Sequence, residues 1–375
     1  MAGRRGNNEG SVRKRPDGRW EARLRLPDNQ RKSLYGDTRQ EAVKELQAFQ
    51  RQLEQGMPVA AEKLTLAHYL HDWLDGIRPP TLEYATWNSY EQFIRIHLIP
   101  AIGSTRLAKL TPQQLQKLYA DKLAEGKSST TVRHIHACLH KALEDALRFG
   151  LVQRNVASLV KAPPMRKHAM QVYSPDQARK LLTTAQGERL EAAYVLALST
   201  GMREGELLAL KWRDVDLDEG VIRIQTTLKR APLGKRTIGK PKTAGSRRKV
   251  MLTPTAQSAL KRHKVRQLEE RLQAGPGWQD HDLVFTNTVG NALDPTNFYR
   301  YQYKPLLKRA GLPYIRFHDL RHSAATLLLL SGVHPKVVSE MLGHSSINIT
   351  LNLYSHVLPD MQASATTAME RLLQG

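Results

Sequence analysis

Cysteine is almost absent from this 375-residue sequence, which contains only Cys138. A single cysteine excludes an internal disulfide framework and a zinc site built from several cysteines, and it fits a reducing compartment. The first residues, MAGRRGNNEG, contain no apolar stretch of the kind found in a signal peptide. Apolar runs such as Leu327–Leu330 are far shorter than the roughly 20 residues of a membrane-spanning helix. We therefore expect a cytoplasmic protein with no membrane partner.

Acidic residues are also scarce relative to basic ones, with 35 Asp and Glu against 57 Lys and Arg. The formal net charge of +22 predicts a polyanionic partner, with DNA or RNA first among the candidates. A soluble protein that is basic for another reason remains the alternative. The sequence has no glycine-rich phosphate loop, no HExxH motif and no paired-carboxylate arrangement, so the common nucleotide and metal chemistries have no support.

Residues 1–56 have the pattern of a small sheet followed by a helix. Two turn signals, PDG at 16–18 and PDN at 27–29, separate three short strand-like runs. Apolar and charged residues alternate along residues 20–26, which predicts a strand with one buried face. A helix is expected next, because four apolar residues share one helical face: Ala42, Leu46, Phe49 and Leu53.

This first segment is strongly basic, with ten Lys and Arg but four Asp and Glu in residues 1–32. A basic sheet with two turns can enter the major groove of DNA, which is wide enough for a β-ribbon. A basic face that is simply solvated explains the same pattern equally well.

Residues 64–161 have an entirely helical pattern. Five helices are expected, near residues 66–75, 83–97, 112–125, 128–149 and 153–160. Their ends are marked by residues such as Pro112 and Gly126. One helix has a cationic side, made of Lys127, Arg133, His134, His136, His140 and Lys141. No carboxylate or cysteine accompanies His136 and His140 as a further metal ligand, so a helix side that faces solvent or phosphate is favoured over a metal site.

A linker with two prolines and several basic residues, KAPPMRKHAM (161–170), separates this segment from the rest. From residue 172 to 375 the pattern mixes helices with strands, which we expect near residues 221–228, 247–252 and 283–285. The predicted fold class is therefore multidomain α+β: a small three-stranded sheet plus a helix, an all-helical segment, and a mixed, mainly helical segment.

The third segment contains basic residues at distinctive positions. Arg203 follows Gly201 at a turn that leads into an apolar helix, where a surface salt bridge would also explain it. Residues 229–249 contain nine Lys and Arg and no acid, a composition suited to a phosphate backbone. Lys242 lies near the middle of this run, in KTAGS.

Further along, His318 and Arg321 are three residues apart at an expected helix start. Both would lie on one face near the positive end of the helix, which is a natural site for an anion. A second helix ends at Gly343-His344, and Tyr354 comes ten residues after that histidine. Taken singly, Tyr354 fits a buried aromatic residue and His344 fits a helix C-terminal cap.

Five stretches of the third segment occur in a distinctive order: TGMREGELLAL, KTAGSRRKVML, HDLRHSAAT, LGHSS and TLNLYSHV. In order and spacing they resemble the boxes of the tyrosine recombinase (phage integrase) family. The basic sheet and the helical segment look like that family's arm-binding and core-binding domains. The resemblance implies three domains: an arm-type DNA-binding domain at 1–56, a helical core-binding domain at 64–161 and a catalytic domain at 172–375.

The resemblance also implies how a phosphodiester would be cut. Arg203 and Arg321 would hold the non-bridging oxygens of the scissile phosphate, for which a guanidinium fork is suited. Tyr354 would attack the phosphorus and form a 3′-phosphotyrosyl bond. Lys242 would donate a proton to the leaving 5′ oxygen.

Four more residues receive supporting roles from the resemblance. His318 would give acid–base support at the phosphate, and His344 would hydrogen-bond to it. Glu206 and Asp319 match acidic positions that support the reacting residues without reacting themselves. No metal or cofactor is implied, because the cationic side chains stabilise the charge that a metal would otherwise stabilise.

The proton donor has competitors. The connection between Thr227 and Arg247 is long and also contains Lys235 and Lys240. We choose Lys242 because KTAGSRRKV best resembles the family's usual turn.

The last residues of the chain could form a helix with one apolar side, made of Met361, Ala365, Ala368, Met369, Leu372 and Leu373. In related integrases such a tail often docks on a neighbouring subunit. Packing on its own domain is the alternative.

Taken together, the resemblance implies an integrase that moves a phage or another mobile element in a bacterial cytoplasm. The core-binding and catalytic domains would close around duplex DNA, and four copies would exchange strands through a Holliday junction. Partners would be double-stranded DNA at core and arm sites and, for some elements, a directionality factor and a host DNA-bending protein. A type IB topoisomerase and a non-catalytic DNA-binding regulator stay open. The additional N-terminal segment argues against a topoisomerase, and the complete set of six site residues argues against a non-catalytic regulator.

Overall fold

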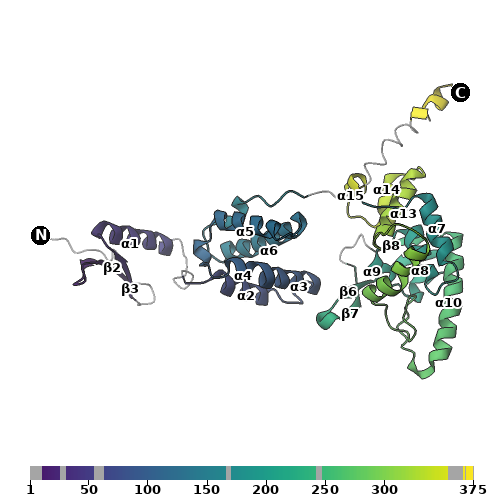
Figure 1. Cartoon of the computed structure of the whole chain (residues 1–375), viewed down its shortest axis with the longest axis horizontal. Coiled ribbons are helices and arrows are strands. Elements are labelled where there is room, and N and C mark those ends of the chain that lie inside the picture. Colours follow the sequence, from purple (N-terminus) through teal and green to yellow (C-terminus); the bar gives the residue numbers. More distant parts are fainter. Residues whose placement is uncertain are drawn as a thin grey trace. The chain divides into compact units, whose positions relative to one another are not determined.

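The computed structural model describes residues 11–25, 31–54, 63–165, 170–241, 247–353, 366–367 and 369–374. The chain divides into two compact units, Met1–Lys167 and His168–Gly375, whose elements are labelled in Figure 1. Helices and small antiparallel sheets occur together, which confirms the predicted α+β class. None of the described helices is long and apolar enough to cross a membrane.

The N-terminal sheet is antiparallel, with the strand order β1 (Ser11–Lys14), β2 (Trp20–Arg25) and β3 (Arg31–Gly36). Helix α1 (Arg39–Glu54) contacts all three strands. The alternation along β2 points every second side chain toward this helix. The resulting apolar cluster consists of Ala22, Leu24, Ala42, Leu46 and Phe49. The predicted sheet and helix are confirmed, while the side chain of Leu53 lies outside the described residues.

The rest of the first unit is helical. Its α-helices are α2 (Leu66–Gly76), α3 (Tyr84–Phe93), α4 (Ile99–Ile102), α5 (Pro112–Ala124) and α6 (Ser129–Arg148). Shorter turns are the π-helical η2 (Ile94–Leu98) and the 3₁₀ turns η3 (Leu107–Lys109) and η4 (Val156–Leu159). Helix α5 begins at Pro112 because Thr111 and Gln114 form a capping box before it.

The helix expected at 153–160 is wrong, because only the four-residue turn η4 forms there. Asn155 caps the start of this turn, because its side chain accepts a hydrogen bond from the backbone N–H of Ala157 at 3.1 Å, and residues 153–155 therefore lie outside it. The predicted cationic side of α6 also has specific contacts. His136 Nδ1 lies 3.0 Å from the Tyr119 hydroxyl, and His140 Nε2 lies 3.1 Å from the Ser158 hydroxyl.

The second unit is mainly helical. Its α-helices are α7 (Pro175–Ala185), α8 (Glu191–Thr200), α9 (Glu204–Leu207), α10 (Pro254–Ala274), α11 (Pro295–Phe298), α12 (Lys304–Arg309), α13 (Asp319–Leu330), α14 (Pro335–Leu342) and α15 (Ile347–Leu353). A π-helical turn, η9 (Tyr299–Tyr303), joins α11 to α12, and 3₁₀ turns occur at η5 (Trp212–Asp214), η6 (Pro232–Gly234) and η8 (Gly275–Gly277). Helix α8 contacts α7, α10 and α13. It is apolar on nearly all sides because it is surrounded by other helices.

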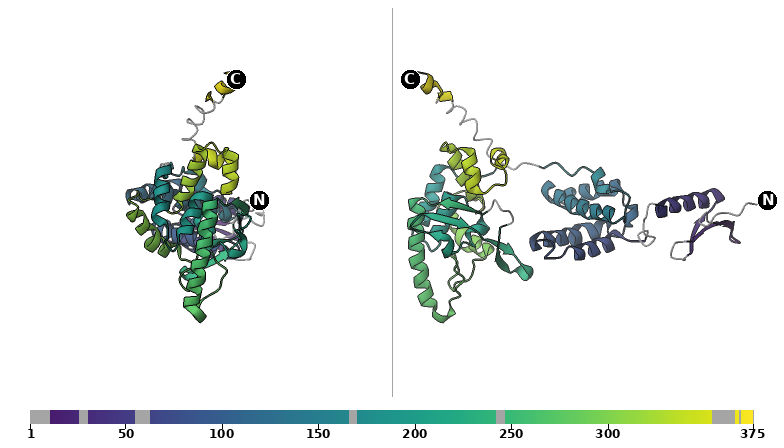
Figure 2. Two further views of the ribbon diagram at one scale, coloured as in Figure 1. Left: turned by 90° about the vertical axis from the view of Figure 1, so that its right-hand side faces the viewer. Right: turned by 180° about the vertical axis from the view of Figure 1, so that it is seen from behind.

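Two small sheets complete this unit. The first has the order β4 (Val215–Asp216), β5 (Val221–Ile224) and β8 (Arg248–Met251), and the second is the hairpin of β6 (Thr227–Arg230) and β7 (Arg236–Gly239). The strand expected at 221–228 is therefore two strands, and the extra length after Thr227 contains this hairpin. Figures 1 and 2 show the hairpin and the long helix α10 on opposite sides of the unit.

The strand expected at 283–285 is wrong. Leu283 and Thr286 form only isolated bridges, although Leu283, Val284 and Phe285 are buried. Side chains of α10 satisfy this buried backbone: Gln267 Nε2 donates to the carbonyl oxygens of residues 283 and 284, and His263 Nε2 lies 2.7 Å from that of residue 284.

Candidate active site

Arg203 lies at a junction between two helix ends. Helix α8 ends at Thr200 and is capped by Gly201, which has a left-handed backbone (φ 61°), and Arg203 precedes the first residue of α9. A Cβ atom at Gly201 would lie 2.5 Å from the Cδ2 atom of Leu342 in α14. Glycine is therefore required here both by the backbone and by the close approach of α14. That approach allows Arg203 Nη2 to donate to the carbonyl oxygen of Gly343 at 3.0 Å.

Arg321 reaches the same junction from α13. Its side chain is buried, and its Nη1 donates to the carbonyl oxygen of Gly201 at 2.8 Å. Arg203 and Arg321 come from sequence positions more than a hundred residues apart, yet both bind backbone carbonyls at the adjoining ends of α8 and α14. The structure therefore brings these two predicted residues together.

A buried carboxylate, Glu206, fixes Arg203. Its Oε1 accepts a hydrogen bond from Arg203 Nη1 at 2.7 Å, and its Oε2 accepts from Arg248 Nη2 at 3.0 Å. Burial by itself would raise the pKa of Glu206, but the charge of Arg248, followed by that of Arg203, outweighs it and lowers the pKa. Glu206 therefore stays charged and holds both guanidinium groups.

Arg248 is a residue of this site that the sequence reasoning missed. It is buried on β8, and its Nε also donates to the carbonyl oxygen of Met341 in α14 at 2.6 Å. A signal was present in the sequence, because strand alternation puts residue 248 on the same face as the buried Val250 and opposite the exposed Lys249. Arg248 thus ties the sheet, Glu206 and the end of α14 into one unit.

Two predicted histidines lie close to these arginines. Burial, then the charges of His322 and Arg321, lowers the pKa of His318 to about 4. Burial, then the charges of Arg321 and Arg203, lowers the pKa of His344 to about 4. Both imidazoles are therefore neutral near neutral pH and can accept a proton or a hydrogen bond.

His322 is a second residue that the sequence reasoning did not single out. Its ring centroid lies 5.5 Å from that of His318, nearly at right angles, and burial lowers its pKa as well. The signal was the four-residue spacing within HDLRH, which places both histidines on one side of α13. His344 has a different neighbour, since its Nδ1 lies 2.8 Å from the Thr350 hydroxyl of α15.

Asp319 supports the entry to α13. Its carboxylate accepts hydrogen bonds from the backbone N–H of Arg316 at 2.9 Å and from the guanidinium of the same residue at 2.8 and 3.0 Å. These bonds fix the turn that carries His318. The remaining predicted site residues, Lys242 and Tyr354, lie outside the described residues. Tyr354 directly follows α15.

The competing lysines are described. Lys235 directly follows the turn η6 between β6 and β7, and Lys240 directly follows β7. Neither has a contact with the two site arginines among the hydrogen bonds of the described residues. The choice of proton donor stays a prediction.

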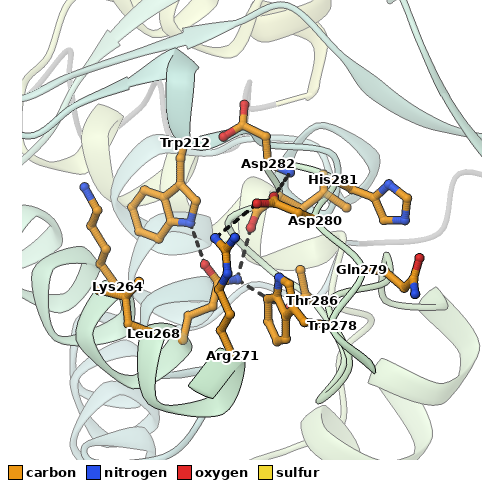
Figure 3. A pocket seen from close by; sticks show the side chains of 13 residues that line it. Trp212, Lys264, Leu268, Arg271, Trp278, Gln279, Asp280, His281, Asp282 and Thr286 are labelled. Atoms are coloured by element: carbon orange, nitrogen blue, oxygen red, sulfur yellow. Dashed lines mark hydrogen bonds and ion pairs between the residues drawn. The ribbon is translucent and has the colours of Figure 1, made fainter. Parts of the chain in front are cut away.

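A separate cavity of about 200 Å³ lies beside α10 (Figure 3). Its lining includes Trp212, Arg271 and Trp278, and no predicted site residue. The groups that surround it bind one another: Trp212 Nε1 donates to Gln267 at 2.6 Å, and Arg271 pairs with Asp280 at 3.1 Å. Across the described ranges, no three His, Cys, Asp or Glu side chains are grouped so that they could hold a metal ion.

The chemistry of the junction is that of an anion site. Two fixed guanidinium groups and two neutral imidazoles surround one region, and the nearby carboxylate of Glu206 is already neutralised by Arg203 and Arg248. Preorganised donors of this kind stabilise the charge that develops on a phosphoryl group during transfer.

Comparison with known sequences gives two family matches. The phage integrase family matches residues 171–361, and the phage integrase N-terminal SAM-like domain matches residues 65–124. A tyrosine recombinase XerC-like protein of Caldanaerobacter subterraneus subsp. tengcongensis is 33% identical over 360 residues, which cover 91% of this chain and 92% of the relative. An integrase of Streptomyces ambofaciens is 31% identical and covers 97% of both chains. The ICEBs1 integrase of Bacillus subtilis is 26% identical over 76% of this chain and 78% of its own.

Solved structures are similar as well. The Tn1549 transposon integrase in complex with transposon right end DNA has a TM-score of 0.69 at 23% identity, over 83% of this chain and 100% of that chain. A lambda integrase dimer bound to a COC′ core site has a TM-score of 0.59 at 19% identity, over 94% and 96% of the two chains. At these identities the similarity concerns the fold.

Proposed function

The chain belongs to the phage integrase family of tyrosine recombinases, and from that premise we propose that it cuts and rejoins duplex DNA through a covalent bond to Tyr354. The observation that carries this proposal is the pair Arg203 and Arg321, which are fixed at one junction by Gly201, Glu206 and the end of α14. Two rigid guanidinium groups are suited to the two non-bridging oxygens of a phosphodiester.

The proposed reaction combines the two arginines of the junction with Tyr354 and Lys242, whose roles come from the family resemblance. The hydroxyl oxygen of Tyr354 attacks the phosphorus, so that a tyrosine–phosphorus bond forms while the bond to the 5′ oxygen breaks. Arg203 and Arg321 stabilise the negative charge that grows on the phosphoryl oxygens. The 5′ oxygen takes a proton from Lys242 and leaves as a hydroxyl.

Neutral histidines complete the site. Because His318 has a pKa of about 4, it is unprotonated near neutral pH. The negative charge of a bound phosphate raises that pKa, so that His318 can accept the proton that Tyr354 loses. His344, which is also neutral, donates a hydrogen bond to the phosphate from its Nε2 while its Nδ1 faces Thr350. Rejoining reverses these steps with a new 5′ hydroxyl, and it needs no ATP because the phosphotyrosyl bond conserves the energy of the phosphodiester.

DNA binding is divided among the three segments. Residues 64–161 and 172–375 grip the core site where strands are cut, and the basic sheet of residues 1–56 binds outlying arm sites. The active assembly is a tetramer on two duplexes, a proposal supported by the lambda integrase, whose tetramer is bound to a Holliday junction. Relatives named for phage, transposon and ICEBs1 integrases support an element that moves between DNA sites. A directionality factor and a host DNA-bending protein belong to this proposal as accessory partners.

A plasmid assay separates this function from its rivals. Two copies of the DNA that flanks the coding sequence are placed on one supercoiled plasmid and incubated with purified full-length protein, in parallel reactions with and without a host-cell extract that supplies the accessory partners. A recombinase deletes or inverts the DNA between the copies, and Tyr354→Phe abolishes the product while Tyr301→Phe, at an exposed tyrosine, does not.

The other outcomes contradict the proposal. Relaxation of any supercoiled plasmid without recombinant product would indicate a topoisomerase. Tight DNA binding with no relaxation by the purified protein and no recombinant product even with the extract would indicate a regulator.

A further inference from the structure

The N-terminal sheet has one face against α1 and a second face rich in arginine. Ala22 and Leu24 of β2 point to α1, so Glu21 and Arg23 lie on the opposite face. The strand register brings Arg13 of β1 beside Glu21 on one side, and it pairs Arg23 with Ser33 of β3.

Glu21 is buried on this arginine-rich face, with an exposed fraction of 3%. Arg13 covers it from one side, where Nε and Nη2 both donate to Glu21 Oε2 at 2.9 Å. Arg23 covers it from the other side, where Nε donates to Oε1 at 2.9 Å. These arginines and the Ser33 side chain account for its low pKa, with the hydrogen bond from Arg23 the largest cause, and lower it to about 2. The carboxylate is therefore charged at any physiological pH.

The two arginines keep donors for a further partner. Arg23 contacts Glu21 only through Nε, and Arg13 only through Nε and Nη2, so terminal nitrogens of both remain available. Their side chains are 39% and 56% exposed. An arginine fork matches the O6 and N7 acceptors of guanine in the major groove, which is also wide enough for a two-stranded β-ribbon such as β1 and β2.

An acid on a DNA-binding face reduces its general attraction for phosphate. The same acid restricts the rotamers of two long side chains, which reduces the entropy lost when they bind a defined base. The carboxylate therefore favours discrimination between sequences over general affinity.

We propose that Glu21 is a positioning residue that fixes Arg13 and Arg23 for recognition of guanine in the major groove of duplex DNA. This inference rests on the proposed binding of outlying DNA sites by residues 1–56.

Selection from a pool of random-sequence DNA duplexes tests it with the full-length chain. Wild type is compared with Glu21→Gln and with the double variant Arg13→Ala/Arg23→Ala. The base preferences that the double variant loses identify the positions of the DNA site that the sheet reads. Asp17→Asn is the matched control, because Asp17 also pairs with two arginines but at an exposed turn, and its replacement changes the charge by the same amount.

At those positions, Glu21→Gln is expected to weaken the preference for guanine roughly tenfold, the scale of one good bidentate contact. Its affinity for the unselected pool should equal or exceed that of wild type, and Asp17→Asn should keep the preference. Arg23→Lys should lose the same preference with its charge retained, which extends the test should Glu21→Gln fold poorly.

Contrary results fall into two distinguishable classes. The positioning role is overturned if Glu21→Gln folds and keeps the guanine preference that the double-arginine variant loses, or if Arg23→Lys keeps that preference. In both cases the proposed binding of arm sites would still stand. If the double-arginine variant selects the same sequences as wild type, the sheet reads no DNA, and the arm-binding proposal fails together with this inference.

Discussion

Glu21 in the N-terminal sheet and Glu206 in the second unit are both buried carboxylates that hold two arginines, yet their surroundings differ. The partners of Glu21 reach solvent, with 56% of the Arg13 side chain and 39% of the Arg23 side chain exposed. Of the partners of Glu206, Arg248 is enclosed, with 7% of its side chain exposed, while Arg203, at 35%, is about as exposed as Arg23. The same ion-pair arrangement therefore serves an open face in one region and, in the other, a junction that encloses one of its two arginines.

The pKa values of the two carboxylates express this difference. A hydrogen bond from Arg23 is the largest influence on Glu21 and lowers its pKa. Burial is the largest influence on Glu206 and acts to raise its pKa, so that this group stays ionised only because Arg248 and Arg203 are present. Loss of a partner should consequently cost stability at Glu206 and mainly recognition at Glu21.

The largest expected effect is that of Arg248→Met. It leaves Glu206 buried with one partner, and breaking a buried ion pair costs about 3–5 kcal/mol. Chemical unfolding monitored in the second unit should show this loss, and DNA cleavage should fall with it. The exposed neighbour provides the control, because Lys249→Met should change the free energy of unfolding little. Equal effects of the two replacements would show that the Arg248–Glu206 pair contributes no special stability.

Arg203→Lys should act on catalysis more than on folding. Lysine keeps the charge but not the fork that binds Glu206, Gly343 and a phosphate oxygen together. Single-turnover cleavage should slow roughly 100-fold, the scale for removal of one preorganised donor, at unchanged DNA affinity. Arg213→Lys, at a largely exposed arginine of the same unit, should cleave like wild type. A cleavage rate for Arg203→Lys equal to that control would contradict the assigned role.

The histidines of the second unit predict a dependence of stability on pH. His318 and His344 are neutral in the folded protein down to a pKa of about 4, against 6.5 for a free histidine. Since the unfolded chain binds protons in this range and the folded chain does not, stability should be full above 6.5 and fall as the pH drops toward 4. The double variant His318→Gln/His344→Gln lacks these two groups, so its denaturant midpoint should depend less on pH than that of wild type, and the two midpoints should converge at lower pH. If the two midpoints instead fell in parallel as the pH dropped, the lowered pKa values of His318 and His344 would be contradicted.

The smallest expected effect is that of Glu21→Gln on cleavage. A substrate that contains only the core site should be cut at the wild-type rate, because Glu21 holds two arginines of the N-terminal sheet, whose proposed targets are outlying arm sites. Glu206→Gln should slow the same reaction strongly. If both variants cleaved equally well, Glu206 would have no special part in holding Arg203.

The sequence predicted the elements whose signals are local. The alternation of β2 and the cap before Pro112 depend only on residues that are neighbours in the sequence, and strand β2 and helix α5 lie where they were predicted. The apolar run at 283–285 was predicted as a strand because its sequence does not reveal that Gln267 and His263, on another helix, bind its carbonyl groups. The segment is buried, but it forms no strand.

The site shows the same limit. Arg203 and Arg321 could be identified as site residues from the sequence motifs that contain them, and the structure brings them to one junction. Arg248 was not chosen, because a run of basic residues is usually a solvated face and its partner Glu206 lies 42 residues away. The roles of Lys242 and Tyr354 stay predictions.

Covalent trapping tests the central claim, cleavage by Tyr354 at the arginine junction, most directly. Duplex DNA with a 5′-bridging phosphorothiolate at the cut site prevents rejoining, and the trapped protein is digested so that the peptide bound to DNA can be identified. We expect a 3′-phosphotyrosyl bond at Tyr354, formed by the wild type and absent from Tyr354→Phe. A DNA-bound peptide from any other part of the chain, or a trapped product with Tyr354→Phe, would contradict the account.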